Sequence, residues 1–217
     1  MALSDTVPPP LTAFADPLQA LRQATAATHA MLDARLAIAQ PTATLMDYAA
    51  HARGLAAWLQ ALSPPLAALQ ADMPHFEFMP AHRLAHLQQD LQDIAAPAPA
   101  CWPAPSTPTR LRAEAALQKA RGAGQARAAR WGMGYVVEGS QLGGLVLHAR
   151  LAGALAPHPL RYLRGSAGDT AGRWKCFVGQ LRDHLNHSAA VAAACDGAQA
   201  AFDGLVDEFT GTGGLLP

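Results

Sequence analysis

The feature that most constrains this chain is a glycine-rich stretch at residues 132–151, which reads GMGYVVEGSQLGGLVLHARL. Its flanking residues favour a helix, whereas Gly139, Gly143 and Gly144 fall in the middle of it. A glycine inside a helix costs about 1 kcal/mol relative to alanine, so this group indicates a bend or a very close approach of the backbone to something else. Two interpretations follow: another helix packs across small residues, or a flat ligand lies against bare backbone.

Length and composition predict a single domain. The chain has 217 residues, of which 51% are hydrophobic and 15% charged, so it can bury one sizeable core. The formal net charge is zero, whereas nucleic-acid-binding proteins carry a basic face, and we expect no nucleic-acid partner. Cys101, Cys176 and Cys195 are scattered and have no metal-ligand spacing, as is typical of reduced thiols in the cytosol.

Neither secretion nor membrane insertion is indicated. The first residues, MALSDTVPPPLTAFADP, lack a basic region followed by an apolar run, and so they do not resemble a signal peptide. No segment reaches the roughly 18 uninterrupted apolar residues typical of a membrane-spanning helix. We therefore expect a cytoplasmic protein without a membrane partner.

Helix start and stop signals organise the rest of the chain. Residues 1–15 include three consecutive prolines and predict a disordered tail, residues 211–217 predict a glycine-rich C-terminal tail, and the helical domain spans residues 16–210. A proline-rich loop is expected at 95–108, and no strand pattern persists. The prediction is an all-α, single-domain bundle. Helices are expected at about 16–40, 44–63, 65–71, 80–94, 107–122, 125–155, 169–186 and 188–209.

The first predicted helix carries a histidine with polar neighbours on the same face. Asp16 is expected to cap this helix, and Pro17 to occupy its first position. Arg22, Thr25 and His29 recur at three- and four-residue spacing. Arg22 precedes His29 by two turns, about 10 Å along the axis. Taken alone, the pattern allows a core histidine bonded to a neighbour and a solvated arginine.

Two motifs resemble those of one protein family. YVVEGSQLGG at 135–144 is similar to the distal-helix signature of haem oxygenases, and most similar to that of bacterial members. LRQATAATHAMLD at 21–33 resembles the proximal-helix motif of the same family, in which the histidine binds haem iron. A weaker match joins APHP at 156–159 with RWKCF at 173–177. The resemblance extends over about 15–209.

The resemblance implies a haem oxygenase-like bundle in which haem lies between the first helix and a glycine-kinked distal helix. Its metal ligand would be His29, since a neutral imidazole suits haem iron and takes a partner on its second nitrogen. The distal, catalytic wall would comprise Gly139, Ser140, Gly143 and Gly144. The groups that bind the cofactor would be Arg22, Thr25, His29, Tyr135 and Lys175. Glu138 is left open between a hydrogen-bonding group of the site and a buried carboxylate.

The activity that the resemblance implies is oxidative opening of haem at a meso carbon. The products would be biliverdin, ferrous iron and carbon monoxide, and haem would be both cofactor and substrate. Dioxygen would be the co-substrate, and an external donor such as ferredoxin, a flavoprotein reductase or an ascorbate-like reductant would supply electrons. A bilin-accepting protein is a further expected partner. The serine at position 140 matches the bacterial pattern, whereas mammalian members have an aspartate there.

Two alternative functions stay open at this point. The chain could be a non-catalytic haem carrier or sensor with the same fold, or a helical module that binds no haem. A Soret band on addition of hemin would exclude the second alternative. Loss of that band and growth of biliverdin absorbance with reductant and air would exclude the first.

Several other side chains are interpreted as structural. Trp174 and Phe177 are expected to pack in the core, as is His51 on the second predicted helix. His82 and His86 lie four residues apart, a spacing that suits a metal on one helix face, but no third ligand is evident. We therefore predict no metal site at this histidine pair.

Overall fold

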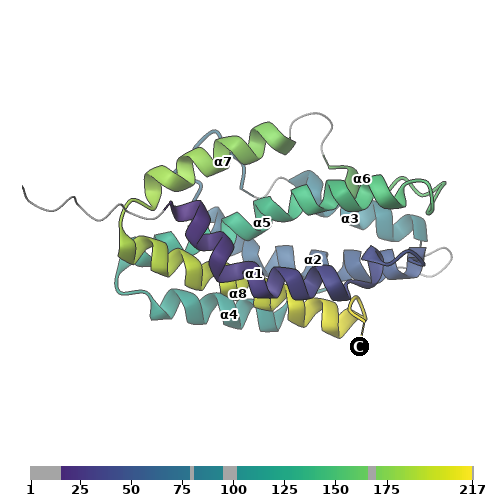
Figure 1. Cartoon of the computed structure of the whole chain (residues 1–217), viewed down its shortest axis with the longest axis horizontal. Coiled ribbons are helices and arrows are strands. Elements are labelled where there is room, and N and C mark those ends of the chain that lie inside the picture. Colours follow the sequence, from purple (N-terminus) through teal and green to yellow (C-terminus); the bar gives the residue numbers. More distant parts are fainter. Residues whose placement is uncertain (1–15, 79–80, 95–101, 166–169, 217) are drawn as a thin grey trace, which may run out of the picture.

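The computed structural model describes residues 16–78, 81–94, 102–165 and 170–216, which form a helical bundle (Figure 1). Within these ranges the one β-pairing is an isolated bridge between Leu36 and Leu215. The predicted all-α class is confirmed. The elements are α1 (Pro17–Arg35), η1 (Ala37–Ala39), α2 (Leu45–Ala67), α3 (Ala81–Ile94), α4 (Thr107–Lys119), α5 (Ala123–Leu151), α6 (Arg161–Arg164), α7 (Thr170–His184) and α8 (Ser188–Thr212).

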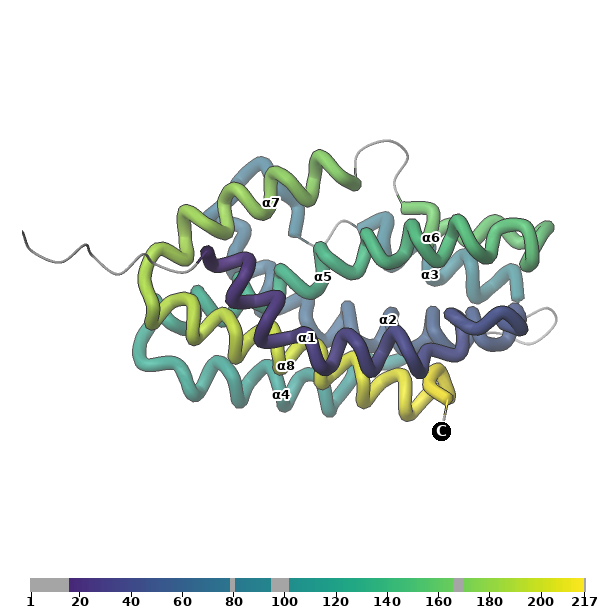
Figure 2. Tube along the Cα trace, viewed as in Figure 1, coloured from purple at the N-terminus to yellow at the C-terminus, as the bar shows by residue number. Residues whose placement is uncertain are grey.

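Helices α5 and α8 form the most extensive helix pair of the bundle. Helix α8 also packs against α1, α2 and α4, while α5 also packs against α6 and α7. Figure 2 shows the trace of α5 running above those of α1 and α8, with α7 beyond it. The first half of α5 therefore packs directly on α8. Its second half lies between α6 on one side and α1 on the other.

Small residues bring the first half of α5 directly against α8. A Cβ at Gly132 would collide with the carbonyl oxygen of Ala194, and a Cβ at Gly197 would collide with that of Ala129. Glycine is required at such contacts because no side chain separates the two backbones. Packing across small residues thus accounts for Gly132 and Gly197.

A buried carboxylate ties α5 to α3 and α7. Glu138 is 3% exposed, and both its oxygens accept hydrogen bonds from Arg83 at 3.0 Å and from Arg173 at 2.7 and 2.9 Å. The Arg173 guanidinium also lies 3.9 Å from the centre of the Phe76 ring. The open question about Glu138 is answered: it is a buried structural carboxylate paired with two arginines.

A second buried carboxylate fixes α6 beside α5. Asp90 of α3 is fully buried and accepts hydrogen bonds from the Tyr48 hydroxyl at 2.5 Å and the Tyr162 backbone N–H at 3.0 Å. It also accepts one from the Arg161 guanidinium at 3.1 Å. In the APHP segment, His158 Nε2 lies 3.1 Å from the Asp90 carbonyl oxygen. These bonds tie the short α6 helix to α3, and α6 also packs against α5.

Two helix ends differ from the prediction. Asp16 precedes α1 as expected, but its side chain does not cap the helix, because its carboxylate instead accepts hydrogen bonds from Arg182 at 2.8 and 3.2 Å. Helix α1 ends at Arg35 and a 3₁₀ turn follows.

Helix α2 continues through Pro64 and Pro65 to Ala67, so the predicted break at 63 and the separate helix at 65–71 are wrong. Proline φ suits a helix, although each of the two prolines lacks the N–H that would bond the carbonyl four residues earlier.

Other boundaries follow the sequence signals. Thr44 caps α2 with the backbone N–H of Asp47 as donor, and Asp47 returns the bond in a capping box. Residues 211–216, where a tail was expected, begin as the last turn of α8 and then cross to α1. There the Leu216 N–H donates to the Arg35 carbonyl at 2.7 Å, and the Ala37 N–H donates to the Gly214 carbonyl at 2.9 Å.

None of the helices in the described ranges is both long enough and apolar enough to cross a membrane. Helix α5 is the longest, at 29 residues, and it carries arginines, a glutamate and several glycines.

Candidate functional site

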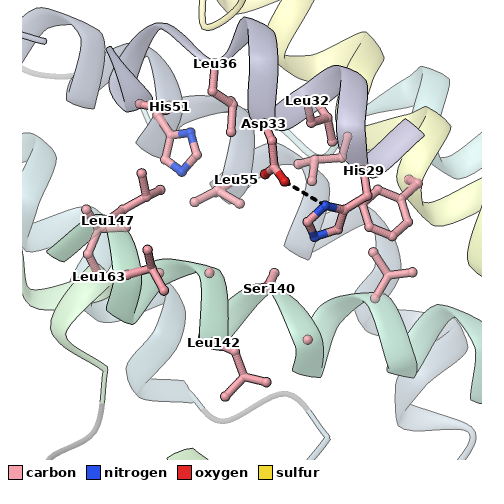
Figure 3. A pocket seen from close by; sticks show the side chains of 18 of the residues that line it. His29, Leu32, Asp33, Leu36, His51, Leu55, Ser140, Leu142, Leu147 and Leu163 are labelled. Carbon is pink, nitrogen blue, oxygen red and sulfur yellow. Dashed lines mark ion pairs between the residues drawn. The ribbon is translucent and has the colours of Figure 1, made fainter. Parts of the chain in front are cut away.

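A cavity of about 720 Å³ lies between α1, α2 and α8 on one side and α5, α6 and α7 on the other (Figure 3). Its volume is in the range of sites that hold cofactor-sized molecules. The lining is mostly apolar, with polar groups at a few positions. The lining residues are Arg22, His29, Leu32, Asp33, Leu36, Ala39, His51, Leu55, Tyr135, Val136, Gly139, Ser140, Leu142, Gly143, Gly144, Val146, Leu147, Arg150, Tyr162, Leu163, Trp174, Phe202, Leu205 and Phe209.

His29 presents its ring to the cavity from α1. Its side chain is 61% exposed, so it is not a core histidine. Its Nδ1 lies 2.9 Å from Oδ2 of Asp33, one turn later on the same helix, and its ring edge meets Phe202 at a centroid distance of 5.9 Å. Figure 3 shows the other ring nitrogen directed towards α5. Because a carboxylate occupies Nδ1, the proton is assigned to that nitrogen and Nε2 is left as a free donor of its lone pair.

Asp33 is a site residue that the sequence analysis did not identify. It lies four residues after His29, so the two side chains are neighbours on one helix face. That spacing was the available signal. The imidazole is therefore oriented by Asp33 of its own helix and by its contact with Phe202 of α8.

The wall opposite His29 includes bare helix backbone at the glycines of α5. A Cβ at Gly143 would meet no atom within 4 Å, and one at Gly139 would meet only the Trp174 ring at 3.8 Å. A Cβ at Gly144 would make ordinary contact with the Leu163 backbone, at 3.6 Å. Helix α5 is continuous through all three glycines. Helix packing therefore does not account for Gly139 and Gly143, in contrast to Gly132.

One end of the cavity carries a cation and a phenol. Burial raises the pKa of Tyr135, while a hydrogen bond with Thr25 and the positive charge of Arg22 act against that rise, so the three side chains lie together. Thr25 is itself buried, donates to the Leu21 carbonyl at 2.8 Å and does not line the cavity. Trp174 does line it, with its ring 5.8 Å from that of Tyr135, so it is not only a packing residue. This end suits an acidic group.

Lys175 does not join this end. Its side chain is exposed and it is not among the residues that line the cavity. The next residue along a helix is turned by about 100°, so when Trp174 faces the cavity Lys175 points elsewhere. Phe177, by contrast, is fully buried and packs in the core as predicted.

Two side-chain hydrogen bonds lie along the α5 wall, and one of them reaches α6. The Ser140 hydroxyl donates to the Val137 carbonyl at 2.8 Å, and the Gln141 side-chain amide donates to the Tyr162 hydroxyl at 2.8 Å. Burial raises the pKa of Tyr162, so its phenol stays neutral. No sequence motif indicated Tyr162, whose place at the cavity depends on the packing of α6 against α3 and α5.

His51 also lines the cavity, at the end away from Arg22. It is 5% exposed, as expected for a core residue, and its ring stacks on Phe209 at a centroid distance of 4.6 Å. Burial lowers its pKa to about 4, so the ring is neutral near pH 7. The prediction of a buried histidine is confirmed, and its position on the cavity wall is new.

The shape of the cavity fits a flat macrocycle that carries a metal. Arg22 lies seven residues before His29 on α1, and Leu36 follows the end of that helix; both line the cavity, so it extends about 10 Å to either side of the imidazole. The free His29 nitrogen faces one side of such a ring, and bare backbone at Gly143 faces the other. Within the described residues no group of three or more histidine, cysteine, aspartate or glutamate side chains forms a separate metal site, and this includes His82 and His86.

Comparison with known proteins agrees with this geometry. A family model described as "Heme oxygenase" matches residues 15–208. A curated protein named "Heme oxygenase", from Xanthomonas campestris pv. campestris (strain 8004), is 37% identical over 123 residues, which are 55% of this chain and 62% of that protein. The aligned part of the chain thus spans 62% of the length of the curated relative that it matches.

Proposed function

Because the chain belongs to the haem oxygenase family, we propose that it opens the haem ring oxidatively at a meso carbon. The products are biliverdin, ferrous iron and carbon monoxide, and the reaction uses dioxygen and electrons from an external donor. The observation that carries the proposal is the pairing, across one cavity, of an imidazole held by Asp33 with bare backbone at Gly143. Family membership itself implies a haem-binding protein.

In this proposal His29 is the protein ligand of the haem iron. Its Nε2 is the nitrogen free to bind, and the Asp33 carboxylate keeps the proton on Nδ1 and the ring in orientation. A carboxylate on the second nitrogen also makes an imidazole a stronger electron donor. Bound haem supplies the iron centre at which dioxygen is activated.

The α5 wall covers the opposite side of the ring. At Gly139 and Gly143 the absence of a Cβ lets a macrocycle touch the helix. Polar groups near this wall are the Ser140 hydroxyl and the neutral Tyr162 phenol, which Gln141 orients. Such groups would hold water by hydrogen bonding without titrating near pH 7, so this side of the cavity would offer hydrogen bonds without a strong acid.

Arg22 and Tyr135 would bind the haem propionates. The guanidinium would supply charge, and the phenol lies beside it as a polar contact for the same acidic group. Lys175 is outside the proposed set because it does not line the cavity.

A hemin titration followed by turnover tests the function. Added hemin should give a Soret band that saturates at one equivalent, and reductant with air should then replace it with biliverdin absorbance. Carbon monoxide trapped by added ferrous myoglobin should appear in step with the bilin. A stable Soret band under these conditions would instead favour a haem carrier or sensor, and no band at micromolar hemin would exclude both functions.

A further inference from the structure

The inner end of the cavity contains one polar side chain in apolar surroundings. His51 of α2 is neighboured there by Leu36, Leu55, Leu147 and Leu163, which all line the cavity. Figure 3 shows the His51 ring extending towards α5, on the far side of Asp33 from His29. The imidazole therefore faces the ligand space and not the bulk solvent, consistent with its 5% exposure.

The His51 ring has an unmet capacity for hydrogen bonding. Its Nδ1 is buried and has no hydrogen-bond partner among the described residues. Its neutral ring carries one proton, and buried N–H groups without a partner are rarer in proteins than unpaired acceptors. The favoured tautomer thus leaves Nδ1 as the bare acceptor and puts the proton on Nε2. In Figure 3 this second nitrogen points into the cavity, so His51 offers an N–H donor there.

The proposed haem orientation gives this donor no partner on the intact ring. If the propionates lie at Arg22, the edge of the ring that reaches His51 is the one farthest from them. In haem b that edge carries vinyl and methyl groups around the α-meso carbon, and none of these accepts a hydrogen bond. Opening the ring there leaves a lactam carbonyl oxygen on each of the two newly separated pyrroles, and each oxygen is a good acceptor.

We propose that His51 Nε2–H donates a hydrogen bond to the lactam oxygens of a bilin opened at the meso carbon farthest from the propionates. This inference rests on the proposed function and assigns a product-binding role to His51. A donor that is satisfied only after oxygen has been added to that edge favours the oxidised state over the substrate. It also disfavours bilins opened elsewhere, since those would place vinyl or methyl carbons against the N–H.

The test measures bilin binding to the protein free of haem. Chemical oxidation of hemin gives a mixture of the four biliverdin isomers, and each can be quantified by chromatography after retention on immobilised protein. The wild type, His51→Leu and His51→Gln are compared, with His82→Leu as the matched control, because His82 is exposed and does not line the cavity. Glutamine keeps an N–H donor on the side chain, whereas leucine does not.

We expect the wild type and His82→Leu to retain the isomer opened farthest from the propionates about tenfold better than the other three. His51→Leu should lose this preference and His51→Gln should recover part of it, and the affinity of His51→Leu for hemin, measured at the Soret band, should change less than its affinity for this isomer. Equal isomer selectivity in the wild type and His51→Leu would overturn the inference while leaving the proposed function intact. So would a parallel loss of hemin and bilin affinity in His51→Leu, which indicates a role in folding only. Failure of the wild type to bind hemin would overturn the proposed function as well.

Discussion

Replacing Gly143 by leucine should have opposite effects on two quantities, the stability of the fold and the affinity for hemin. A Cβ at this position would meet no atom within 4 Å, so the folded protein accommodates the new side chain without a clash. Leucine is also a better helix former than glycine, by about 0.8 kcal/mol. The free energy of unfolding of the haem-free protein should therefore rise by roughly 0.5–1 kcal/mol.

Hemin binding should change in the opposite direction. The side chain at position 143 would extend into the cavity from the wall that faces His29, where the proposed macrocycle touches bare backbone. Forcing a large group into an occupied space costs typically about 1–3 kcal/mol. That corresponds to hemin affinity weakened by about five- to 150-fold, since 1.4 kcal/mol is a factor of ten.

The matched control lies on the same helix. A Cβ at Gly124 also meets no atom within 4 Å, but Gly124 does not line the cavity. Urea unfolding of the haem-free variants and hemin titration at the Soret band give the two quantities. Both leucine variants should be slightly more stable than the wild type, and only Gly143→Leu should bind hemin weakly. Wild-type hemin affinity in Gly143→Leu would refute the placement of the ligand against α5.

Four further outcomes are expected from the contacts described above. His29→Ala should change the free energy of unfolding by less than about 0.5 kcal/mol, because the side chain is 61% exposed, and ferrous haem in it should regain normal coordination only when imidazole is added. Asp33→Asn should keep haem bound but lower the iron–histidine stretching frequency in resonance Raman spectra; an unchanged frequency would show that the carboxylate does not act on the imidazole. Glu138→Gln should lower the free energy of urea unfolding by about 3–5 kcal/mol, because it leaves two arginines without their buried counter-charge. The pKa of His51 is lowered from 6.5 to about 4 in the folded protein, so as pH falls the unfolded chain binds a proton at this residue before the folded protein does. The free energy of unfolding should therefore decrease as pH drops from 7 to 5. This decrease should be about 2 kcal/mol smaller in His51→Leu.

Local sequence signals predicted most of the helices because caps and breakers act over a few residues. The Thr44–Asp47 capping box marks the start of α2, and Ser188 begins α8 as expected. Signals that compete with distant partners were less reliable. Asp16 binds Arg182, a residue 166 positions away, and does not cap the helix. Pro64 lies within α2, which is otherwise well packed. No short window of sequence contains those contacts.

The candidate site divides in the same way. His29 and Gly143 belong to motifs of fixed spacing, and they line the same cavity even though they lie far apart in the chain. Tyr162 and His51 carry no motif, since each reaches the cavity only because of how α6 and α2 pack. Lys175 is the opposite case. A motif match suggested it as a binding residue, but its position on α7 turns it away from the cavity.

The cavity itself follows from a change in side-chain size along α8. Where α8 meets the first half of α5, its facing residues are small, and Gly197 allows direct backbone contact with Ala129. Further along, α8 presents Phe202, Leu205 and Phe209, which line the cavity. The small residues let α8 touch α5 at Gly132. The large side chains keep the two helices apart at Gly143. Because Glu138 also anchors α5 midway to α3 and α7, the helix cannot close onto α1, and the glycines beyond that point are left facing space for a ligand.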